Sequence, residues 1–427
     1  MSELSYLEKL LDGVEVEWLP LSKVFNLRNG YTPSKTKKEF WANGDIPWFR
    51  MDDIHENGRI LGNSLQKISS CAVKGGKLFP ENSILISTSA TIGEHALITV
   101  PHLANQRFTC LALKESYADC FDIKFLFYYC FSLAEWCQKN TTMSSFASVD
   151  MDGFKKFLIP RPCPDNPEKS LAIQSEIVRI LDTFSALTAE LTAELTAELN
   201  MRKKQYNYYR DQLLSFKEGE VEWKTLGDVT KKWYSGGTPT AGKIEYYENG
   251  NIPWLRTQEV KFSEIDSTEI KITQAALKNS SAKWIPRNCV IIAISGATAG
   301  RSAINKIPLT TNQHCGCLEI DDTKALYRYV FHWVSFNYEN IKSLGQGARG
   351  DLNSTIIKNF KLPIPHASDP QKSLKEQARI VEILDKFDTL TNSITEGLPR
   401  EIELRQKQYE YYRDLLFSFP KPETVSN

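Results

Sequence analysis

The sequence contains one unit twice, and this repeat restricts the possible folds more than any other feature of the chain. The sequence Glu-Val-Glu-Trp at 15–18 returns at 220–223. Further matches pair 32–33 with 238–239, 45–50 with 251–256, 86–93 with 292–300, 105–106 with 312–313, 177–182 with 380–385 and 204–216 with 407–419. The offset stays between 203 and 207 residues. A unit of roughly 205 residues is therefore used twice.

Each copy begins with a segment, 15–160 or 220–363, that mixes short β-branched and aromatic runs with Gly, Asn and Pro. The apolar runs at 83–87 and 289–293 predict buried strands. The segments 122–139 and 324–344 predict helices. We expect an α+β globule in each copy.

The rest of each copy is predicted to be helical. Prolines end the globules, at Pro160, Pro162, Pro164 and Pro167 and at Pro363, Pro365 and Pro370. Apolar residues then recur three or four positions apart, at Ile177, Ile180, Leu181, Phe184, Leu187, Leu191, Leu195 and Leu199 and at Ile380, Ile383, Leu384, Phe387 and Leu390. Such a narrow stripe needs a helical partner. Each helix would be about 60 Å long at ~1.5 Å per residue, so each is the natural partner of the other. Gly397 and Pro399 should kink or break the second helix.

The order of the segments suggests a closed, pseudo-twofold arrangement. Residues 6–11 precede the first Glu-Val-Glu-Trp much as 209–214 precede the second. We expect helical regions at 1–14, 161–219 and 364–427 and globules at 15–160 and 220–363. The expected fold class is α+β, with two globules at opposite ends of two long antiparallel helices that form a coiled coil.

The charge of the chain is balanced, with 52 Lys and Arg and 52 Asp and Glu in 427 residues. This excludes a uniformly basic nucleic-acid coat and an acidic tail protein. The first globule has 16 basic and 15 acidic residues and the second has 18 and 14, so any DNA contact must come from local patches. There is no basic start followed by an apolar core and no apolar run of ~20 residues. With nine cysteines and no CxxC pair, a cytoplasmic protein without a membrane segment is expected.

Motifs that carry chemistry are absent. The sequence has no GxxxxGK[ST] loop, no HExxH and no Asp/Asn-Pro-Pro-aromatic motif. Cys315 and Cys317 beside His314 are too closely spaced for a usual zinc site and lack a second pair. A single GxGxxG match at 345–350 follows an apparent helix, whereas a dinucleotide loop follows a strand. We interpret it as a flexible loop or as a DNA-facing loop that carries Arg349. The chain is therefore expected to be non-catalytic and to bind no metal.

The arrangement of globules and helical regions, together with several repeated motifs, resembles that of a known protein family. Two diverged globules separated by two near-identical helical regions resemble the specificity subunit of type I restriction–modification enzymes. The doubled Ile-Val-x-Ile-Leu-Asp at 177–182 and 380–385 and the doubled Gln-Tyr-x-Tyr-Tyr-Arg-Asp at 205–211 and 408–414 carry the resemblance. The tetrapeptide Thr-Ala-Glu-Leu occurs three times in tandem at 188–199, and this array looks like the central spacer of the type IC branch.

The resemblance implies a role within a larger complex. The family's globules are target-recognition domains that each read one half of a split double-stranded DNA sequence. Its helical regions bind two methyltransferase subunits, through which restriction and motor subunits join. S-adenosylmethionine, ATP and Mg²⁺ are then expected on those partners, and no cofactor is expected on this chain.

The candidate DNA-reading residues are polar or basic side chains near the repeated motifs. They are Lys35, Lys37, Arg50, Ser87, Thr88, Thr91, Gln106 and Arg107 in the first globule and Lys243, Arg256, Ser295, Thr298, Arg301, Asn312, Gln313 and Arg349 in the second. Arg suits guanine, and Gln or Asn suits adenine. The alternative is that repeated polar residues such as Asn105 and Asn312 cap turns. The tyrosines at 206, 208, 209, 409, 411 and 412 are interpreted as helix packing or as a partner interface.

The tetrapeptide array suggests a molecular ruler. Its units begin at Thr188, Thr192 and Thr196 and end at Leu191, Leu195 and Leu199. Each unit adds about 6 Å of helix, which corresponds to one or two base pairs at about 3.4 Å each. In the family, the number of units is associated with the length of the unread gap. The alternative is a plain helix-forming repeat without a metric role.

Two other classes of protein fit the sequence less well. A self-contained DNA methyltransferase or nuclease would need a catalytic motif, and the sequence shows none. A coiled-coil scaffold that does not bind DNA would leave the doubled globules unexplained. The target bases cannot be derived from side-chain identity alone.

Overall fold

The computed structural model describes residues 6–142, 147–217, 219–347, 350–392 and 396–421. The chain divides into two compact units. The first unit consists of residues 1–193 and 403–427, and the second unit of residues 194–402. Each unit thus contains one globule together with parts of both helical regions, and each is described by itself.

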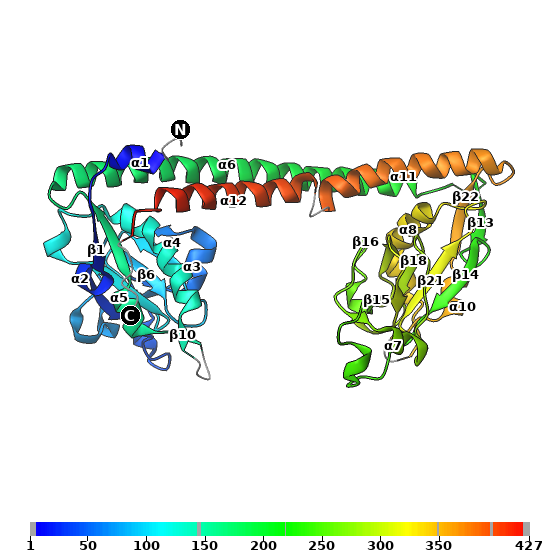
Figure 1. The fold of residues 1–427 in the computed structure, drawn as a ribbon, viewed down its shortest axis with the longest axis horizontal. Coiled ribbons are helices and arrows are strands. Elements are labelled where there is room, and N and C mark those ends of the chain that lie inside the picture. The colour runs from blue at the N-terminus through cyan, green and yellow to red at the C-terminus, as the bar shows by residue number, and fades with distance from the viewer. Residues whose placement is uncertain (1–5, 143–146, 218, 348–349, 393–395, 422–427) are drawn as a thin grey trace. The chain divides into compact units, whose positions relative to one another are not determined.

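The globule of the first unit is built on several small sheets (Figure 1). The largest has the order β2-β9-β6-β7-β4, with β2 (Phe25–Asn29), β9 (Phe108–Leu113), β6 (Ser83–Ser87), β7 (His95–Ile98) and β4 (Ile60–Leu61). A second has the order β5-β3-β8, with β5 (Lys67–Ile68), β3 (Ile46–Phe49) and β8 (Leu103–Ala104). The strand β1 (Val16–Pro20) pairs with β12 (Leu158–Pro162), and the short β10 (Thr141–Thr142) pairs with β11 (Ser148–Val149).

The globule of the second unit repeats this topology. Its five-stranded sheet has the order β14-β21-β18-β19-β16, with β14 (Thr230–Ser235), β21 (Cys315–Ile320), β18 (Val290–Ala293), β19 (Ser302–Asn305) and β16 (Glu264–Ile265). Its three-stranded sheet has the order β17-β15-β20, with β17 (Lys271–Ile272), β15 (Ile252–Leu255) and β20 (Thr310–Thr311). The strand β13 (Val221–Thr225) pairs with β22 (Lys361–Pro365).

The central strands confirm the buried strands predicted from sequence. All five residues of β6 and all four of β18 are buried. In β6, Ile84 and Ile86 pack into one core cluster, whereas Leu85 packs with Phe49 and Phe79 in another, on the other face of the sheet. Because successive strand residues point to opposite faces, a continuous apolar run is what a strand covered on both faces requires.

Helices connect the strands and cover the sheets. They are α1 (Tyr6–Leu11), α2 (Leu21–Val24), α3 (Met51–Asn57), α4 (Ile123–Lys139), α5 (Met151–Lys156), α6 (Pro167–Leu213), α7 (Gln274–Lys278), α8 (Tyr327–Phe336), α9 (Tyr338–Ser343), α10 (Ser354–Asn359), α11 (Pro370–Asn392) and α12 (Gly397–Leu416). Short 3-10 turns are η1 (Lys38–Phe40), η2 (Ser70–Ala72), η3 (Lys74–Gly76), η4 (Glu115–Tyr117), η5 (Ile244–Tyr246), η6 (Thr257–Glu259) and η7 (Gly296–Thr298). No helix of the described residues is long and apolar enough to cross a membrane.

Two predicted helices are each divided in the structure. The segment 324–344 forms α8 and α9, because Asn337 ends the first and begins the second. Beyond α11, the second long helix resumes as α12 at Gly397, whose φ is +77°. A Cβ on this glycine would lie 2.5 Å from the carbonyl oxygen of Thr389. The break predicted at Gly397 is therefore confirmed, and Pro399 lies in the first turn of α12, where its missing N–H costs little.

Within each unit, two helical segments lie side by side and run in opposite directions (Figure 1). In the first unit Phe184 of α6 stacks on Tyr412 of α12, with ring centroids 5.4 Å apart. In the second unit Phe387 of α11 stacks on Tyr209 of α6 at 5.5 Å. These pairs are equivalent positions of the sequence repeat, so the two helical copies use the same aromatic contact.

A buried glutamine joins each globule to its helical region. Gln174 of α6 accepts a hydrogen bond from the Asp122 amide at 2.9 Å and donates to the Cys120 carbonyl at 2.9 Å. In the second unit, Gln377 of α11 accepts from the Leu326 amide at 2.9 Å. Both glutamines are fully buried. The same side chain of each helical copy therefore holds backbone groups at the start of the main globule helix.

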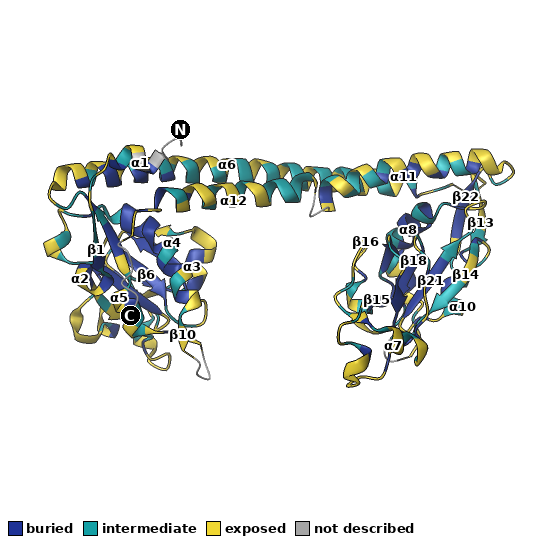
Figure 2. Cartoon of the chain, in the orientation of Figure 1, coloured by how far each residue is buried: buried dark blue, intermediate teal, exposed yellow. Residues whose placement is uncertain are grey.

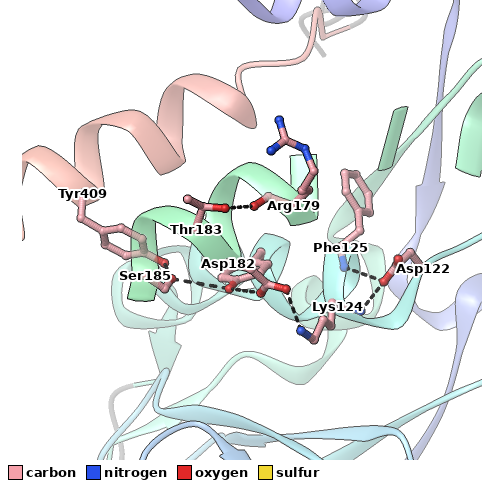
Figure 3. Close-up of polar contacts among 9 residues, drawn as sticks. Asp122, Lys124, Phe125, Arg179, Asp182, Thr183, Ser185 and Tyr409 are labelled. Atoms are coloured by element: carbon pink, nitrogen blue, oxygen red, sulfur yellow. Dashed lines mark hydrogen bonds and ion pairs between the residues drawn. The ribbon is translucent and has the colours of Figure 1, made fainter. Parts of the chain in front are cut away.

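An aspartate lies next to each glutamine joint. In the first unit, Asp182 accepts hydrogen bonds from Lys124 and Tyr128 of α4, both at 2.7 Å. Figure 3 shows this carboxylate beside Lys124, with Ser185 nearby donating to Tyr409 of α12 at 3.0 Å. Asp122 caps the N-terminus of α4 by accepting from the amides of residues 124 and 125. Globule, α6 and α12 are thus tied together in one polar network.

Candidate nucleic-acid interface

In the first unit, four of the predicted DNA-reading residues meet at one cavity. Lys35, Arg50, Gln106 and Arg107 line a cavity of about 330 Å³ together with Thr32, Trp48, Met51, Asp52, Gln66 and Asn105. A second cavity of about 580 Å³ shares Lys35, Arg50 and Gln66 and adds Lys38, Trp41 and Ala42. Residues from separate loops therefore form one basic, partly aromatic surface.

The loop after β3 positions Arg50. The Arg50 amide donates to the Asp53 carboxylate at 2.6 Å, which caps the first turn of α3. The guanidinium lies over the ring of Trp48, 5.9 Å from its centroid, and one terminal nitrogen lies 3.3 Å from Asp52. The Nε atom of Arg50 is buried and has no hydrogen-bond partner in the described part of the chain. Asp53 therefore fixes the backbone of Arg50 and does not bind its guanidinium.

The neighbouring wall of the cavity is a turn held by two repeated polar residues. The Asn105 side chain accepts from the Arg107 amide at 3.0 Å. In the second unit Asn312 accepts in the same way from the His314 amide at 3.1 Å. The alternative role of these asparagines, capping a turn, is thus confirmed. Asn312 is also buried, so it leaves the set of candidate base contacts.

A glutamine follows each of these asparagines and is held by a threonine. The Thr32 hydroxyl donates to Gln106, and the Thr238 hydroxyl donates to Gln313 at 2.6 Å. In the second unit the Gln313 amide also lies 3.1 Å from His314, and His314 lies 2.6 Å from the Ser295 hydroxyl. The two globules therefore orient the same amide, and in the second globule this amide also contacts an imidazole that Ser295 holds.

The arginines at equivalent positions have different surroundings. Arg256 is paired with Glu259 at 3.5 Å and with Glu269 at 2.5 Å. Asp53 of the first globule corresponds to Glu259 of the second. Leu65 corresponds to Glu269, because the Leu65 amide donates to Asp53 just as the Glu269 amide donates to Glu259. The shorter carboxylate and the leucine leave Arg50 with fewer charge partners than Arg256.

The remaining predicted residues differ in how far they are exposed. Lys37 and Lys243 are exposed, and each ammonium lies over an aromatic ring, that of Phe40 and that of Tyr246. Thr91 is exposed in a separate cavity of about 410 Å³, whereas Thr88, Ser295, Thr298 and Arg301 are half-buried. Ser87 is buried and donates to the Ser89 carbonyl at 2.9 Å, so its predicted base contact is replaced by a role in the turn after β6. Arg349 lies outside the described residues.

Sequence reasoning missed several residues that complete the basic surface. Thr32, Lys38, Trp41 and Gln66 line the two cavities with the predicted residues. Thr32 could have been found because it belongs to a repeated dipeptide, and Lys38 because it directly follows the candidate Lys37 in the sequence. Gln66 carried no signal, since its place depends on the pairing of β3 with β5.

Cofactor and metal chemistry has little support in the described ranges. They contain no group of three or more His, Cys, Asp or Glu residues arranged to hold a metal. Cys315 and Cys317 are buried in β21, and burial raises the pKa of the Cys315 thiol to about 12. The glycine loop at 345–350 follows α9 and not a strand. These thiols therefore fit a reduced core, and the loop does not fit a dinucleotide site.

Comparison with known proteins places this architecture in a family. Residues 13–201 and 218–404 each match the type I restriction modification DNA specificity domain. The chain is 65% identical over 398 residues to the type I restriction enzyme EcoprrI specificity subunit of Escherichia coli, covering 93% of both chains. It is 46% identical over 451 residues to the EcoR124I/EcoR124II specificity subunit of the same species, covering 100% of both.

A solved structure supports the fold. A chain from work on complex assembly and conformational transition of the type I R-M system matches with a TM-score of 0.60 and 15% sequence identity. The match covers 94% of this chain and 97% of that one.

The chain therefore belongs to the type I restriction–modification DNA specificity family. Within that class it is a specificity subunit, the non-catalytic subunit that provides DNA recognition. The resemblance inferred from the repeated motifs is confirmed, and the EcoR124I/EcoR124II relative is consistent with the type IC branch. The expectation that the chain is not itself a methyltransferase or nuclease is confirmed as well.

Proposed function

We propose that this subunit reads a split double-stranded DNA target, one half with each globule, and assembles two methyltransferase subunits, through which restriction and motor subunits join. The observation that carries the proposal is the basic cavity of the first globule, where Lys35, Arg50, Gln106 and Arg107 converge. Sequence-specific sites need both cations for phosphates and oriented donors for base edges. This surface offers both.

Arg50 is the proposed base-reading residue of the first globule. A guanidinium pairs with guanine through two parallel hydrogen bonds, which requires free donors and a fixed base of the side chain. The Asp53 cap fixes the backbone of Arg50, and Trp48 supports its guanidinium. Gln106, held by Thr32, offers an amide suited to adenine.

The second globule is proposed to read its half-site with different groups. Arg256 is neutralised by Glu259 and Glu269, so its role is to hold the loop after β15. Gln313 and His314 are exposed and joined by a hydrogen bond, and they occupy the positions of Gln106 and Arg107. Different side chains on one scaffold are what two unlike half-sites require.

The lysines at the edge of these surfaces are proposed phosphate contacts. Lys35, Lys37, Lys38 and Lys243 are exposed and belong to the corresponding loops of the two globules. Phosphate contacts position a protein on DNA but carry no sequence information. Thr91, Thr298 and Arg301 stay in the wider set of proposed DNA contacts.

The remaining proposals concern the division of labour in the complex. We assign target recognition to 15–160 and 220–363 and partner binding to 1–14, 161–219 and 364–427. S-adenosylmethionine, ATP and Mg²⁺ are proposed to bind the partner subunits and not this chain. The assembled enzyme is proposed to act in the cytoplasm, where the chromosome lies.

Methylation mapping tests the proposed reading. The subunit is co-expressed with its methyltransferase partner, and methylated adenines are mapped across the genome. A split motif is expected for the wild type. Arg50→Ala should relax one position of one half-site by roughly 1–3 kcal/mol of discrimination. Methylation without a split motif, or an unchanged motif with Arg50→Ala, would contradict the proposal.

Matched variants separate the roles of the charged residues. Lys35→Ala should weaken DNA binding without changing the motif, because a phosphate contact is independent of sequence. Arg256→Ala should leave the bases of the second half-site unchanged and lower the stability of the second globule. If Arg256→Ala changed the motif while Arg50→Ala did not, the assignment of the two arginines would be reversed.

A further inference from the structure

The two helical copies each expose an apolar stripe that their own unit does not cover. Tyr208 of α6 is 62% exposed and Tyr411 of α12 is 63% exposed. Seven residues earlier on the same helices, Met201 is 46% exposed and Leu404 is 42% exposed. Figure 2 shows exposed residues along both helices. The offset is 203 in both cases, so the stripes are equivalent positions of the repeat.

Each stripe forms one face of its helix. Seven residues make almost two turns, so Met201 and Tyr208 lie on the same side, about 10 Å apart along the axis. The same is true of Leu404 and Tyr411. The stripes are also flanked alike, because Lys204, Gln205 and Asp211 correspond to Lys407, Gln408 and Asp414.

The neighbouring tyrosines show that the stripes are not needed for packing within a unit. Tyr209 and Tyr412 stack on Phe387 and Phe184. Tyr208 and Tyr411 lie about 100° further round each helix and meet these tyrosines only edge-on, at 5.5 and 5.4 Å. The helix pairing therefore uses one face of the second tyrosine of each Tyr-Tyr pair, which remains 45% exposed in Tyr209 and 38% exposed in Tyr412, and leaves the first tyrosine more exposed still.

Single exposed apolar residues are ordinary on protein surfaces. Here an aromatic and an aliphatic side chain recur together, twice, with nearly equal exposures and the same charged neighbours. Tyrosine is also one of the residues that most often anchor protein interfaces. A surface that occurs twice on one chain fits two copies of one partner.

We propose that Met201 with Tyr208, and Leu404 with Tyr411, are the two anchor sites for two copies of the methyltransferase subunit. The inference rests on the proposed function only for the identity of the partner. Each anchor offers a tyrosine ring and an aliphatic side chain beside one lysine and one aspartate. The fitting partner surface is an apolar groove or helix face with an acidic and a basic group at its rim. A second copy of this chain is the competing occupant.

The test counts partner subunits by native mass spectrometry of complexes purified after co-expression with the methyltransferase subunit. The wild type is expected to carry two. The pair Met201→Ala, Tyr208→Ala should carry one, as should the pair Leu404→Ala, Tyr411→Ala, and the quadruple variant should carry none. Loss of an anchor tyrosine should weaken one site by at least about 30-fold, the effect of an interface hot spot.

Controls keep the result interpretable. Lys203→Ala and Gln406→Ala change exposed, equivalent positions on the opposite face of each helix, and both should retain two partner subunits. Tyr208→Lys and Tyr411→Lys keep a good helix former at exposed sites, so they test the anchors without disturbing the fold. Helix content and melting temperature of each variant are compared with the wild type.

Two results would overturn the inference. The first is a folded quadruple or Tyr→Lys variant that still binds two partner subunits with wild-type affinity. The second is wild-type chain that dimerises without the partner, with the variants abolishing dimerisation and leaving partner binding intact. Failure of the proposed function looks different, because two partner subunits would then bind through these anchors while the methylated sites share no split motif.

Discussion

The joints between globule and helical region are built alike in the two units but are completed by different side chains. In both, a buried glutamine and an aspartate come from the repeated helix. In the first unit Lys124 and Tyr128 of the globule bind the aspartate. In the second unit Arg328 at 2.6 Å and His332 at 2.7 Å bind it. The helical copies thus use the same two residues, whereas each globule binds the aspartate with different side chains.

The difference also changes how strongly the two carboxylates are held. Asp385 and Arg328 are 27% and 24% exposed, and His332 is 4% exposed, whereas Asp182 and Lys124 are 38% and 40% exposed. Burial alone would raise the pKa of Asp385, but hydrogen bonds from His332 and Arg328 lower it below its ordinary value. Arg328 also pairs with Glu264 of β16. The second joint is therefore the more buried and the more extensively paired.

Lowering the pH should destabilise the first unit more than the second, and this is the largest difference that we expect between them. Burial lowers the pKa of His95 to about 3 and that of His102 to about 4, both in the first unit. Both values lie below the ordinary 6.5, so the folded unit holds the neutral imidazoles while the unfolded chain binds protons below pH 6.5. The stability of the first unit is therefore full above pH 6.5 and decreases as the pH falls toward 4 and then 3. At pH 5 each histidine should cost the first unit about 2 kcal/mol.

Hydrogen exchange at pH 7 and pH 5, corrected for intrinsic rates, checks this prediction. The amides of β6 and β7 should lose protection at pH 5, and those of β18 and β19 should change less. In the double variant His95→Leu, His102→Leu, the excess acid sensitivity of the first unit should disappear. Equal loss of protection in both units would contradict the assignment to these histidines.

Removing the buried glutamine should destabilise the two joints to a similar extent. Gln174→Leu leaves the partly buried Asp122 amide and Cys120 carbonyl without their partner, and Gln377→Leu does the same to the Leu326 amide and the Lys324 carbonyl. The expected cost is roughly 3 kcal/mol for each. Denaturant unfolding followed by exchange in α4 and α8 measures it. A cost confined to one unit would show that the joints are not equivalent.

Replacing the aspartate should lower the stability of the second unit more than that of the first. Asp385→Asn should cost about 2 kcal/mol, because it removes the carboxylate that accepts hydrogen bonds from the largely buried Arg328 and His332 and leaves Arg328 with Glu264 as its charge partner. Asp182→Asn should cost about 1 kcal/mol, because Lys124 is more exposed and solvent screens the pair. Glu382→Gln, on the exposed side of α11, should not change stability measurably. The order is read from unfolding midpoints, and the reverse order would refute the comparison.

The sequence predicted most of the architecture because the fold is duplicated and locally consistent. Apolar runs revealed β6 and β18, and the capped helix from Asp122 to Lys139 emerged as α4. The helical prediction over 324–344 is confirmed, but its division into α8 and α9 was not foreseen, because apolar spacing continues across Asn337, where one helix ends and the next begins. Periodicity identifies helical faces but not the one residue that interrupts hydrogen bonding.

The candidate site was only partly predictable. Arg50 and Arg256 look equivalent in the sequence, and nothing near them reveals that Glu269 pairs with one while Leu65 stands opposite the other. That difference depends on strand pairing between segments more than ten residues apart. Ser87 and Asn312 are polar in the sequence but buried in the structure, because their hydroxyl and amide groups satisfy turns.

The tetrapeptide array links the two units and bears directly on the central claim. Residues 188–199 lie within α6, a continuous helix of 47 residues, and the division between the units falls inside the array. Removing four residues shortens a helix by about 6 Å and rotates the remainder of it by about 40°, which nearly preserves the face that each residue presents. The helix should therefore survive the deletion.

The most direct measurement is a map of methylated adenines from cells that carry the deletion of residues 188–191. We predict that both half-sites stay the same and that the unread gap becomes one or two base pairs shorter. Replacing the same four residues by alanines should keep the parental gap. A parental gap in the deletion variant, or a change in either half-site, would contradict the account of two reading globules set apart by a helical spacer.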